Sequence, residues 1–380
     1  MRGGERAALP APRASALPAP RASARRVPGS ATGTGQGSIP DVRRPSPGML
    51  DVARTAGVSV GTVSNVLNNP AKVAPPTREK VEAAIAELGF VRNGVARSLK
   101  AGRSTTIGFV LIDLTNSFFL DMVRGAEEVA NEAGMNLLLA NADMNPVKEQ
   151  TFLDLFEEER VAGILLTPRP LADEEGPRPA AAGVPRVHLN DPTAGAEVCS
   201  VTTDNVHGGY LAARHLIDTG RRRLLFAGGD QLDPVRQRFE GALRAVGETN
   251  GAVTLERLPT EWVRPPDGRR VAETILARPA RERPDAVLAG ADLVALGLVQ
   301  ALSVDGRLRI PDDIAVIGYD NNRTAWDSLI PISTLDQAGE EMGRTAASLL
   351  LEEVRGAEDH VHRSVRLQPF LVPRESTVGR

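Results

Sequence analysis

The stretch from Leu50 to Asn68 constrains the fold of this chain more than any other. Apolar residues at helical spacing lead into Gly57, which can adopt the left-handed conformation that ends a helix, and Ser59 can cap the helix that follows. The pattern predicts two short helices joined by a turn, a helix-turn-helix. Small polar side chains on the second helix suit the major groove of DNA. In an isolated stretch, two amphipathic helices around a glycine can produce the same pattern by coincidence.

Residues 73–90 predict a third helix, which would complete a small three-helix core. Prolines stand at its entry, apolar residues recur on one face, and Gly89 ends it. Residues 93–100 offer a further, very short helical piece, and residues 107–112 then begin a buried strand. This continuation makes coincidence a poor explanation of the helix-turn-helix pattern.

A series of short motifs follows along the chain. They are Asp51-Val52-Ala53, Ala56-Gly57-Val58-Ser59, Thr62-Val63-Ser64, Thr77-Arg78-Glu79, Leu88-Gly89-Phe90, Ala96-Arg97-Ser98-Leu99, Thr106-Ile107-Gly108, Asn116-Ser117-Phe118-Phe119 and Gly318-Tyr319-Asp320. In this order and spacing they closely resemble the LacI/GalR family of bacterial transcription regulators, over roughly residues 49–377. The resemblance implies an N-terminal all-α helix-turn-helix head and an α/β core of two Rossmann-like lobes, similar to type I periplasmic binding proteins.

Length and charge agree with a chain of several parts. At 380 residues the chain is too long for one compact unit, so two or three domains are expected. The formal net charge of −3 conceals an asymmetry, because residues 1–48 carry +6, residues 49–105 carry +4 and the remainder carries −13. A basic head on an acidic body is expected where only the head meets DNA phosphates.

Several classes of protein are disfavoured by composition. The single cysteine, Cys199, is expected to exclude both an intramolecular disulfide and a cysteine-based zinc site, which fits a reducing cytoplasm. No apolar run is long enough for a membrane span or a signal peptide. We find no nucleophile-base series, no metal-ligand cluster among the five histidines and no phosphate-binding glycine loop. A cytoplasmic protein that is not an enzyme and needs no metal or cofactor is therefore expected.

Residues 1–48 are rich in Pro, Ala, Arg, Ser and Gly, and residues 8–15 recur immediately as residues 16–23. Because nothing in this segment can pack a core, it is predicted to be a disordered tail. An arm that binds DNA phosphates, a targeting peptide and a true translation start near Met49 are the alternatives. The predicted divisions are a tail (1–48), a helix-turn-helix domain (49–92), a hinge helix with its linker (93–105) and a two-lobed effector-binding and dimerisation domain (106–377).

The second helix of the head supplies the predicted DNA contacts. The resemblance implies that Val60, Gly61 and Asn65 meet base edges, and among these only Asn65 can recognise a base by hydrogen bonds, with adenine preferred over guanine. Short donors and basic side chains in the same region are suited to phosphate oxygens. These phosphate-contact candidates are Ser59, Thr62, Ser64, Asn68, Lys72, Arg78 and Arg97.

Residues 93–99 match the hinge helix of the family, which folds on operator DNA when two copies meet in the minor groove. A piece this short cannot stay helical alone, because nucleating a helix is costly. Leu99 falls where the family inserts a leucine between base pairs, which would bend the duplex; packing of Leu99 on the core is the alternative. The predicted contact residues here are Asn93, Ala96, Arg97 and Leu99.

From residue 107 onward, apolar strands alternate with amphipathic helices. The first series has strands at 107–112, 137–140, 163–166 and 187–189, with helices at 118–133 and 148–159. The second has strands at 201–203, 224–227, 253–258, 286–289 and 314–318, with helices at 206–218, 235–246, 268–277 and 293–304. This alternation predicts two lobes built on parallel sheets. The family resemblance implies that a small ligand sits in a cleft at the strand ends.

The resemblance places a set of effector-binding candidates in this cleft. They are Asn116, Phe118, Phe119, Asp191, Arg238, Asp292 and Asp320, with Trp326 a candidate for stacking or for a packed interface. Carboxylates accept from paired hydroxyls, a guanidinium donates a fork, and an aromatic ring covers the apolar face of a sugar, so the implied effector is a carbohydrate. Ala291 and Ser117 depart from the family pattern and leave the effector's identity open.

The helix predicted at 293–304 has more apolar residues than one sheet face needs, namely Leu296, Leu298, Val299 and Leu302. In the family, this region and the helix after Phe119 help form a homodimer, whose two heads match two half-sites of double-stranded operator DNA. The leading hypothesis is a dimeric repressor controlled by a small-molecule effector. A solute-binding protein of the same core fold, and a regulator that senses a protein partner, are the alternatives.

Overall fold

The computed structural model describes residues 47–90, 104–167, 184–191, 194–229, 231–356 and 360–379. The chain forms two compact units, residues 1–92 and residues 93–380. Most of the predicted tail and hinge lies outside the described residues, so the four predicted domain boundaries stay predictions. No helix in the part of the chain that the structure describes has the length and apolar character to span a membrane.

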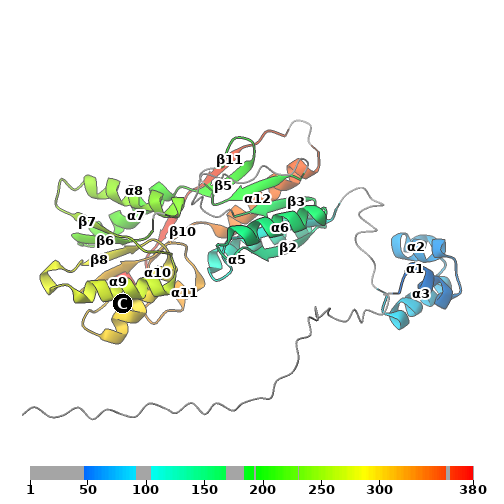
Figure 1. Cartoon of the computed structure of the whole chain (residues 1–380), viewed down its shortest axis with the longest axis horizontal. Helices are drawn as coiled ribbons and strands as arrows, with labels where there is room; N and C mark the ends of the chain where they lie inside the picture. Colours follow the sequence, from blue (N-terminus) through cyan, green and yellow to red (C-terminus); the bar gives the residue numbers. More distant parts are fainter. Residues whose placement is uncertain are drawn as a thin grey trace, which may run out of the picture. The chain divides into compact units, whose positions relative to one another are not determined.

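The first unit contains the predicted helix-turn-helix, in helices α1 (Met49–Ala56), α2 (Val60–Asn68) and α3 (Pro75–Leu88), with a 3-10 turn η1 (Pro70–Lys72) before α3 (Figure 1). Gly57 has a φ of 65°, and the Ser59 hydroxyl accepts a hydrogen bond from the Thr62 amide at 3.1 Å. Both features are those predicted for the turn. The three helices bury one small apolar core, made of Val52, Ala53, Val63, Val66, Val81 and Ala84.

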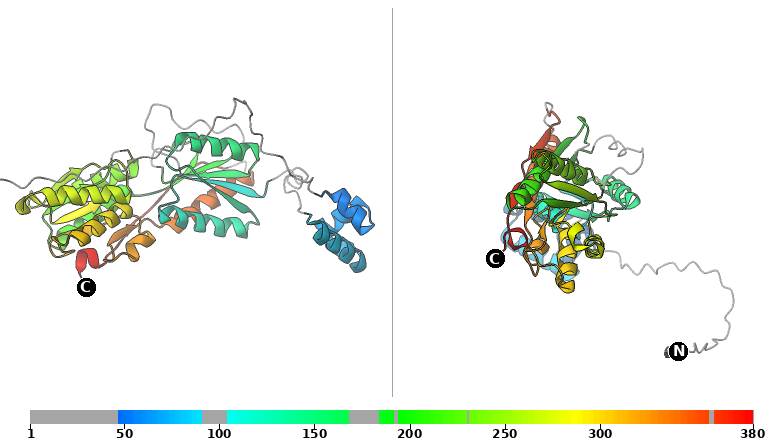
Figure 2. Two further views of the ribbon diagram at one scale, coloured as in Figure 1. Left: turned by 60° about the horizontal axis from the view of Figure 1, so that its bottom comes forward. Right: turned by 90° about the vertical axis from the view of Figure 1, so that its left-hand side faces the viewer.

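The second unit has two lobes, and the first is built on a six-stranded parallel sheet of order β11-β5-β4-β3-β1-β2. The strands are β1 (Thr106–Leu111), β2 (Asn136–Asn141), β3 (Gly163–Leu166), β4 (Arg186–Leu189), β5 (Cys199–Thr203) and β11 (Ser364–Leu367). Helices α5 (Ser117–Glu132) and α12 (Gly339–Val354) cover one face, and α6 (Pro146–Glu158) covers the other (Figure 2). Alternate residues of β1 therefore enter opposite cores, Phe109 on one side and Val110 on the other.

The other lobe is built on a four-stranded parallel sheet of order β7-β6-β8-β9. Its strands are β6 (Arg223–Ala227), β7 (Thr254–Leu258), β8 (Ala286–Ala289) and β9 (Ala315–Ile317). Helices α7 (Asn205–Asp218) and α8 (Asp233–Gly247) pack on one face, and α9 (Pro265–Ala277) and α10 (Asp292–Asp305) pack on the other. The short elements η2 (Ala280–Glu282), α11 (Arg323–Trp326) and α13 (Glu375–Val378) complete this lobe.

The predicted strand at 201–203 was assigned to the wrong sheet. It opened the second series in the prediction, whereas β5 lies in the first sheet, where Cys199 pairs with Val187 and Val201 pairs with Leu189. A short apolar run contains no information about which partner strand it will pair with. The prediction also lacked α12, β11 and the antiparallel pair β10 (Thr334–Asp336) and β12 (Phe370–Val372).

Three of the four apolar residues predicted to form an interface on α10 are buried within their own chain. Leu298, Val299 and Leu302 are buried inside their own lobe, in the core that α10 shares with α9 and the sheet. The helix is apolar on nearly all sides because it is covered on nearly all sides. Leu296 is only partly buried and Val304, near the end of the helix, is 90% exposed, so a homodimer through this region stays a prediction.

Helices α5 and α12 approach each other through glycines, and this contact yields a prediction. A Cβ at Gly343 would overlap the carbonyl oxygen of Met122, whereas a Cβ at Gly247, at the end of α8, would have no described atom within 4 Å. Gly343→Ala is expected to lower the free energy of unfolding by about 1–3 kcal/mol, because the packed helices must separate. Gly247→Ala is expected to leave it unchanged or raise it by up to about 1 kcal/mol. Thermal unfolding of both variants measures this, and equal effects would contradict the close packing.

Candidate functional site

The outer face of α2 presents the residues predicted to meet base edges. Val60 is 38% exposed, and Gly61 and Asn65 are also exposed, while Val63 and Val66 are buried against the other helices. The side chains of Val60 and Asn65 are therefore accessible on the surface of the head, which contact with bases requires. Their contact with DNA stays a prediction.

The hydroxyl and amide side chains predicted for phosphate oxygens make local contacts along the same helix. The Ser59 and Thr62 hydroxyl oxygens lie 2.9 Å apart, and the Asn68 side-chain amide donates to the Ser64 carbonyl at 2.9 Å. These bonds fix the two ends of α2. Lys72 is exposed in η1. Arg78 on α3 lies 3.6 Å from Glu82 in an exposed pair, an arrangement that leaves it easily redirected to a phosphate.

The predicted hinge contacts, Asn93, Ala96, Arg97 and Leu99, lie outside the described residues. Their predicted role in the minor groove is neither supported nor opposed by the geometry of the head.

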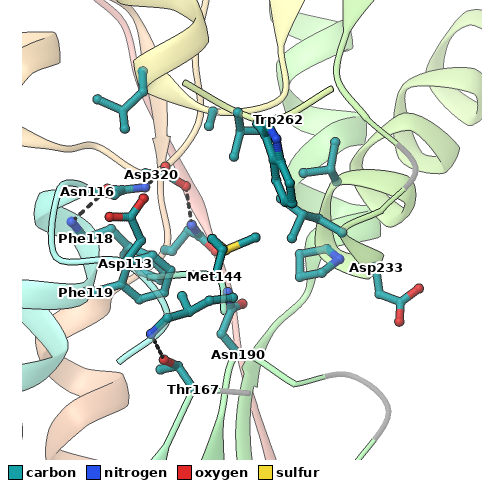
Figure 3. Close-up of a pocket in the computed structure, with 18 of the residues that line it drawn as sticks. Asp113, Asn116, Phe118, Phe119, Met144, Thr167, Asn190, Asp233, Trp262 and Asp320 are labelled. Carbon is teal, nitrogen blue, oxygen red and sulfur yellow. Dashed lines mark hydrogen bonds between the residues drawn. The ribbon is translucent and has the colours of Figure 1, made fainter. Parts of the chain in front are cut away.

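A cavity of about 110 Å³ lies between the two lobes of the second unit, at the carboxyl ends of the strands (Figure 3). Its wall comes from segments that follow β1, β3 and β4 in one lobe and β6, β7, β8 and β9 in the other. The lining residues include Asp113, Asn116, Phe118, Phe119, Met144, Thr167, Asn190, Asp191, Asp233, Arg238, Trp262, Arg264, Ala291, Asp320 and Gln337. Six of the seven effector-binding candidates are thus brought together.

Arg238 organises the polar part of this cavity. Its guanidinium donates to the Asn205 side chain at 2.9 Å, to the Gly290 carbonyl at 2.7 Å and to the Gln337 side chain at 3.1 Å. It also lies 3.7 Å above the Tyr319 ring, and only 5% of the residue is exposed. A cation this buried requires such a set of partners.

Asp320 links the two lobes across the cavity floor. Its carboxylate accepts from the Asn116 amide at 2.9 Å and from the Gln337 amide at 2.6 Å, and it lies 3.6 Å from the Arg238 guanidinium. Burial raises the pKa of Asp320 to about 6, while the Arg238 charge and the two amide hydrogen bonds oppose that rise. The Asn116–Asp320 bond joins the start of α5 in one lobe to the end of β9 in the other.

A few further polar contacts cross between the lobes. Arg264 lies 3.9 Å from Asp113, and the Arg323 amide donates to the Ser117 hydroxyl at 3.0 Å. The side chain of Arg264 is exposed while Asp113 is buried, and an ion pair at 3.9 Å with one exposed partner contributes little. The relative position of the lobes can therefore respond to a molecule that binds between them.

Aromatic side chains cover opposite sides of the cavity. The Phe118 and Phe119 ring centroids lie 5.4 Å apart on α5, and Trp262 stands across the cavity from them, on the other lobe (Figure 3). Asp191 lines the cavity and pairs with His188 Nδ1 at 2.9 Å. Flat apolar faces beside carboxylates and amides suit a ring that bears hydroxyl groups.

Two predicted residues lie away from this cavity. Asp292 is fully buried, and its carboxylate accepts from the Thr334 hydroxyl at 2.7 Å and the Asn322 amide at 2.8 Å. Its side chain turns from the start of α10 toward β10 and α11, and burial together with the Asp320 charge raises its pKa. Trp326 is not among the described lining residues, since its indole donates to Asn321 at 2.6 Å and is half exposed. The placement of Asp292 corrects the prediction, whereas Trp326 still fits the alternative of an interface tryptophan.

The sequence interpretation missed several lining residues, among them Asp113, Asn190, Trp262, Arg264 and Gln337. Asp113 and Asn190 follow buried strands by one or two residues, so their position at strand ends was an available signal. Trp262 and Arg264 follow β7 by a few residues in the same way. No local pattern marks Gln337, which comes after the short strand β10.

The sequence led us to expect no metal-ligand cluster among the five histidines, whereas the structure places two of them beside Cys199. The ligand atoms of Cys199, His360 and His362 all lie within 4.8 Å of one another. They come from β5 and from the segment before β11, at a distance in sequence that composition alone does not reveal.

Comparisons with known proteins agree with both units. Bacterial regulatory proteins of the lacI family match residues 48–93, and a periplasmic binding protein-like domain matches residues 213–377. The chain is 34% identical over 333 residues to the HTH-type transcriptional repressor PurR of Vibrio vulnificus (strain CMCP6), covering 86% of this chain and 97% of that protein.

Solved structures of transcriptional regulators also match this chain over most of its length. The lac repressor dimer bound to operator and the anti-inducer ONPF matches with a TM-score of 0.70 at 27% identity, over 87% of this chain and 99% of that chain. The complex of the transcriptional regulator CelR with cellobiose matches with a TM-score of 0.63 at 30% identity, over 87% and 99% of the two chains.

Proposed function

We propose that this chain, which belongs to the lacI family of bacterial regulatory proteins, is a repressor whose operator binding is controlled by a neutral polyol in the cavity between its lobes. Family membership makes it a DNA-binding transcriptional regulator and not an enzyme. Its helix-turn-helix unit distinguishes it from a solute-binding protein of the same core fold.

The charges around the cavity favour a neutral effector. Asp113, Asp191 and Asp320 line it against the two cations Arg238 and Arg264, while the Asp233 carboxylate pairs with Arg236. An excess of carboxylates disfavours a phosphorylated ligand and provides acceptors for hydroxyl groups. Trp262 and Phe119 on opposite sides favour a ring with apolar faces. The complex of the related CelR with cellobiose supports a sugar.

The same cavity gives a route from effector to DNA. An effector that engages Asp320 competes with the hydrogen bond from Asn116, and so favours a different relative position of the lobes. We infer that this change alters the spacing of the heads in a homodimer, and hence operator affinity, by a coupling of about 1–3 kcal/mol. The lac repressor dimer bound to operator supports two heads on two half-sites. Residues 93–105 would be the hinge, in a cytoplasmic protein.

A thermal-shift screen of the full chain tests the effector class. Neutral mono- and disaccharides, sugar phosphates and nucleosides are compared at equal concentration. A neutral sugar is expected to stabilise the second unit, by about 2.7 kcal/mol at a hundred times its dissociation constant. Stabilisation by sugar phosphates or nucleosides alone would contradict a neutral polyol.

The head yields a separate prediction about base recognition. Asn65→Ala is expected to weaken binding by about 1–3 kcal/mol at operators with adenine at the contacted position, because the bidentate amide is lost. Lys72→Ala is the contrasting variant. It is expected to weaken binding to all DNA sequences alike, and to reduce by about one the slope of the logarithm of the binding constant against the logarithm of the salt concentration. Fluorescence anisotropy on operator pairs with that base pair exchanged measures both. If Asn65→Ala lost the same affinity for both operators of a pair, Asn65 would not recognise that base.

A further inference from the structure

Three side chains with metal-ligand chemistry gather at the amino end of β5. Cys199 Sγ lies 3.3 Å from His360 Nε2 and 3.8 Å from His362 Nδ1, and the two imidazole rings meet edge to face with centroids 5.1 Å apart. Cys199 is fully buried, and the His360 side chain is only 7% exposed. The effector cavity uses none of the three, because it lies at the opposite, carboxyl ends of the strands.

These separations fit a tetrahedral transition-metal site. Zinc–sulfur bonds of about 2.3 Å and zinc–nitrogen bonds of about 2.0–2.1 Å at tetrahedral angles place a sulfur about 3.6 Å from each nitrogen. The two measured sulfur–nitrogen separations lie on either side of that value. A cation can therefore enter with only small side-chain movements. Thiolate and imidazole together favour zinc over the hard cations calcium and magnesium.

The neighbouring carboxylate supplies a second, independent observation. Glu353, near the end of α12, places Oε2 3.8 Å from His360 Nε2. That oxygen is buried and has no hydrogen-bond partner among the described residues. A buried carboxylate oxygen without a donor is costly. A divalent cation at this place would give the Glu353 oxygen a partner and so remove that free-energy cost. One thiolate and one carboxylate together would balance the charge of the cation.

We propose that Cys199, His360 and His362 bind one Zn²⁺ ion, with Glu353 as the adjacent carboxylate and a water molecule in the fourth position. Cys199 comes from β5 and the two histidines come from the residues just before β11, so the ion joins the start of β5 to the start of β11. Strand β11 is the edge of the six-stranded sheet and pairs only with β5 among the described strands (Figure 1). The site therefore fixes the edge strand of the first lobe, and its role is structural.

Metal content of the untagged full chain provides the first test. After loading with Zn²⁺ alone and exhaustive desalting, the wild type is expected to retain about one zinc per chain, and Cys199→Ser and His360→Ala below about a tenth. His207→Ala is the matched control, since this exposed histidine on α7 lies outside the cluster. It is expected to retain zinc like the wild type. Equal zinc content in Cys199→Ser and the wild type would overturn the site.

Cobalt provides a readout that does not depend on how well the variants fold. Co²⁺ added to the wild type is expected to give a thiolate-to-cobalt charge-transfer band and the intense visible bands of tetrahedral coordination. Glu353→Gln keeps all three ligands and is expected to weaken zinc binding about 10- to 100-fold, as loss of an outer-shell partner does. A wild type without these cobalt bands, and with no zinc after desalting, would mean a thiol–imidazole hydrogen-bonded cluster instead.

Discussion

An Arg238→Ala variant is expected to lose effector affinity by about 30-fold or more, because truncating one partner of a buried, hydrogen-bonded charge pair costs about 2–5 kcal/mol. Arg238 is 5% exposed and donates to three groups of its own lobe while standing beside Asp320. Its removal leaves the Asp320 carboxylate buried without a cation. The same loss disorients Gln337, which donates to Asp320 on the cavity floor.

Calorimetry with the sugar found in the thermal-shift screen measures this loss. Arg244→Ala is the matched control, because Arg244 lies on the same helix α8 but is exposed, with its guanidinium 5.6 Å from the Tyr210 ring. This control is expected to bind the sugar within about a factor of three of the wild type, as surface substitutions usually do. Arg238→Lys retains the charge but not the planar fork, so an intermediate affinity is expected. Wild-type affinity in Arg238→Ala would show that the sugar binds elsewhere.

The predictions that succeeded are those whose determinants are local in sequence. The turn of the head depends on Gly57 and Ser59, which lie two residues apart and each act on their own helix. The cavity residues Asn116 and Asp320 lie where a helix begins and just after a strand ends, and the parallel arrangement brings strand ends to one edge of a sheet. Arg238 lies within α8, and only the family resemblance placed it in the cavity. Such features can be inferred from a single chain.

The failures concern long-range pairing and the direction of single side chains. The pairing of β5 with β11 joins Ser200 to Ser364, across more than a hundred residues that contain an entire lobe. Cys199 and His360 are separated by 161 residues, so their contact depends on the same pairing. Asp292 directly follows Ala291, which lines the cavity. Its carboxylate nevertheless points away from the cavity and accepts a hydrogen bond from the Thr334 hydroxyl. Short-range patterns contain neither kind of information.

The largest effect on DNA binding is expected from Ala84→Asp. Ala84 is 3% exposed on α3, in a head core that contains few other buried side chains. A carboxylate placed there costs several kcal/mol, which exceeds the small stability of a domain of this size. The head is therefore expected to unfold, and operator affinity to fall by at least about 100-fold toward non-specific binding.

The neighbouring residue separates unfolding of the head from the effect of the added charge. Ala83 is exposed on the same helix, so Ala83→Asp adds the same carboxylate without burying it. It is expected to change operator affinity by no more than a few fold in fluorescence anisotropy. Both variants should keep their stabilisation by the sugar, because the cavity belongs to the other compact unit. Equal losses of operator binding in the two variants would instead mean that charge on α3, and not the integrity of its core, controls the contact with DNA.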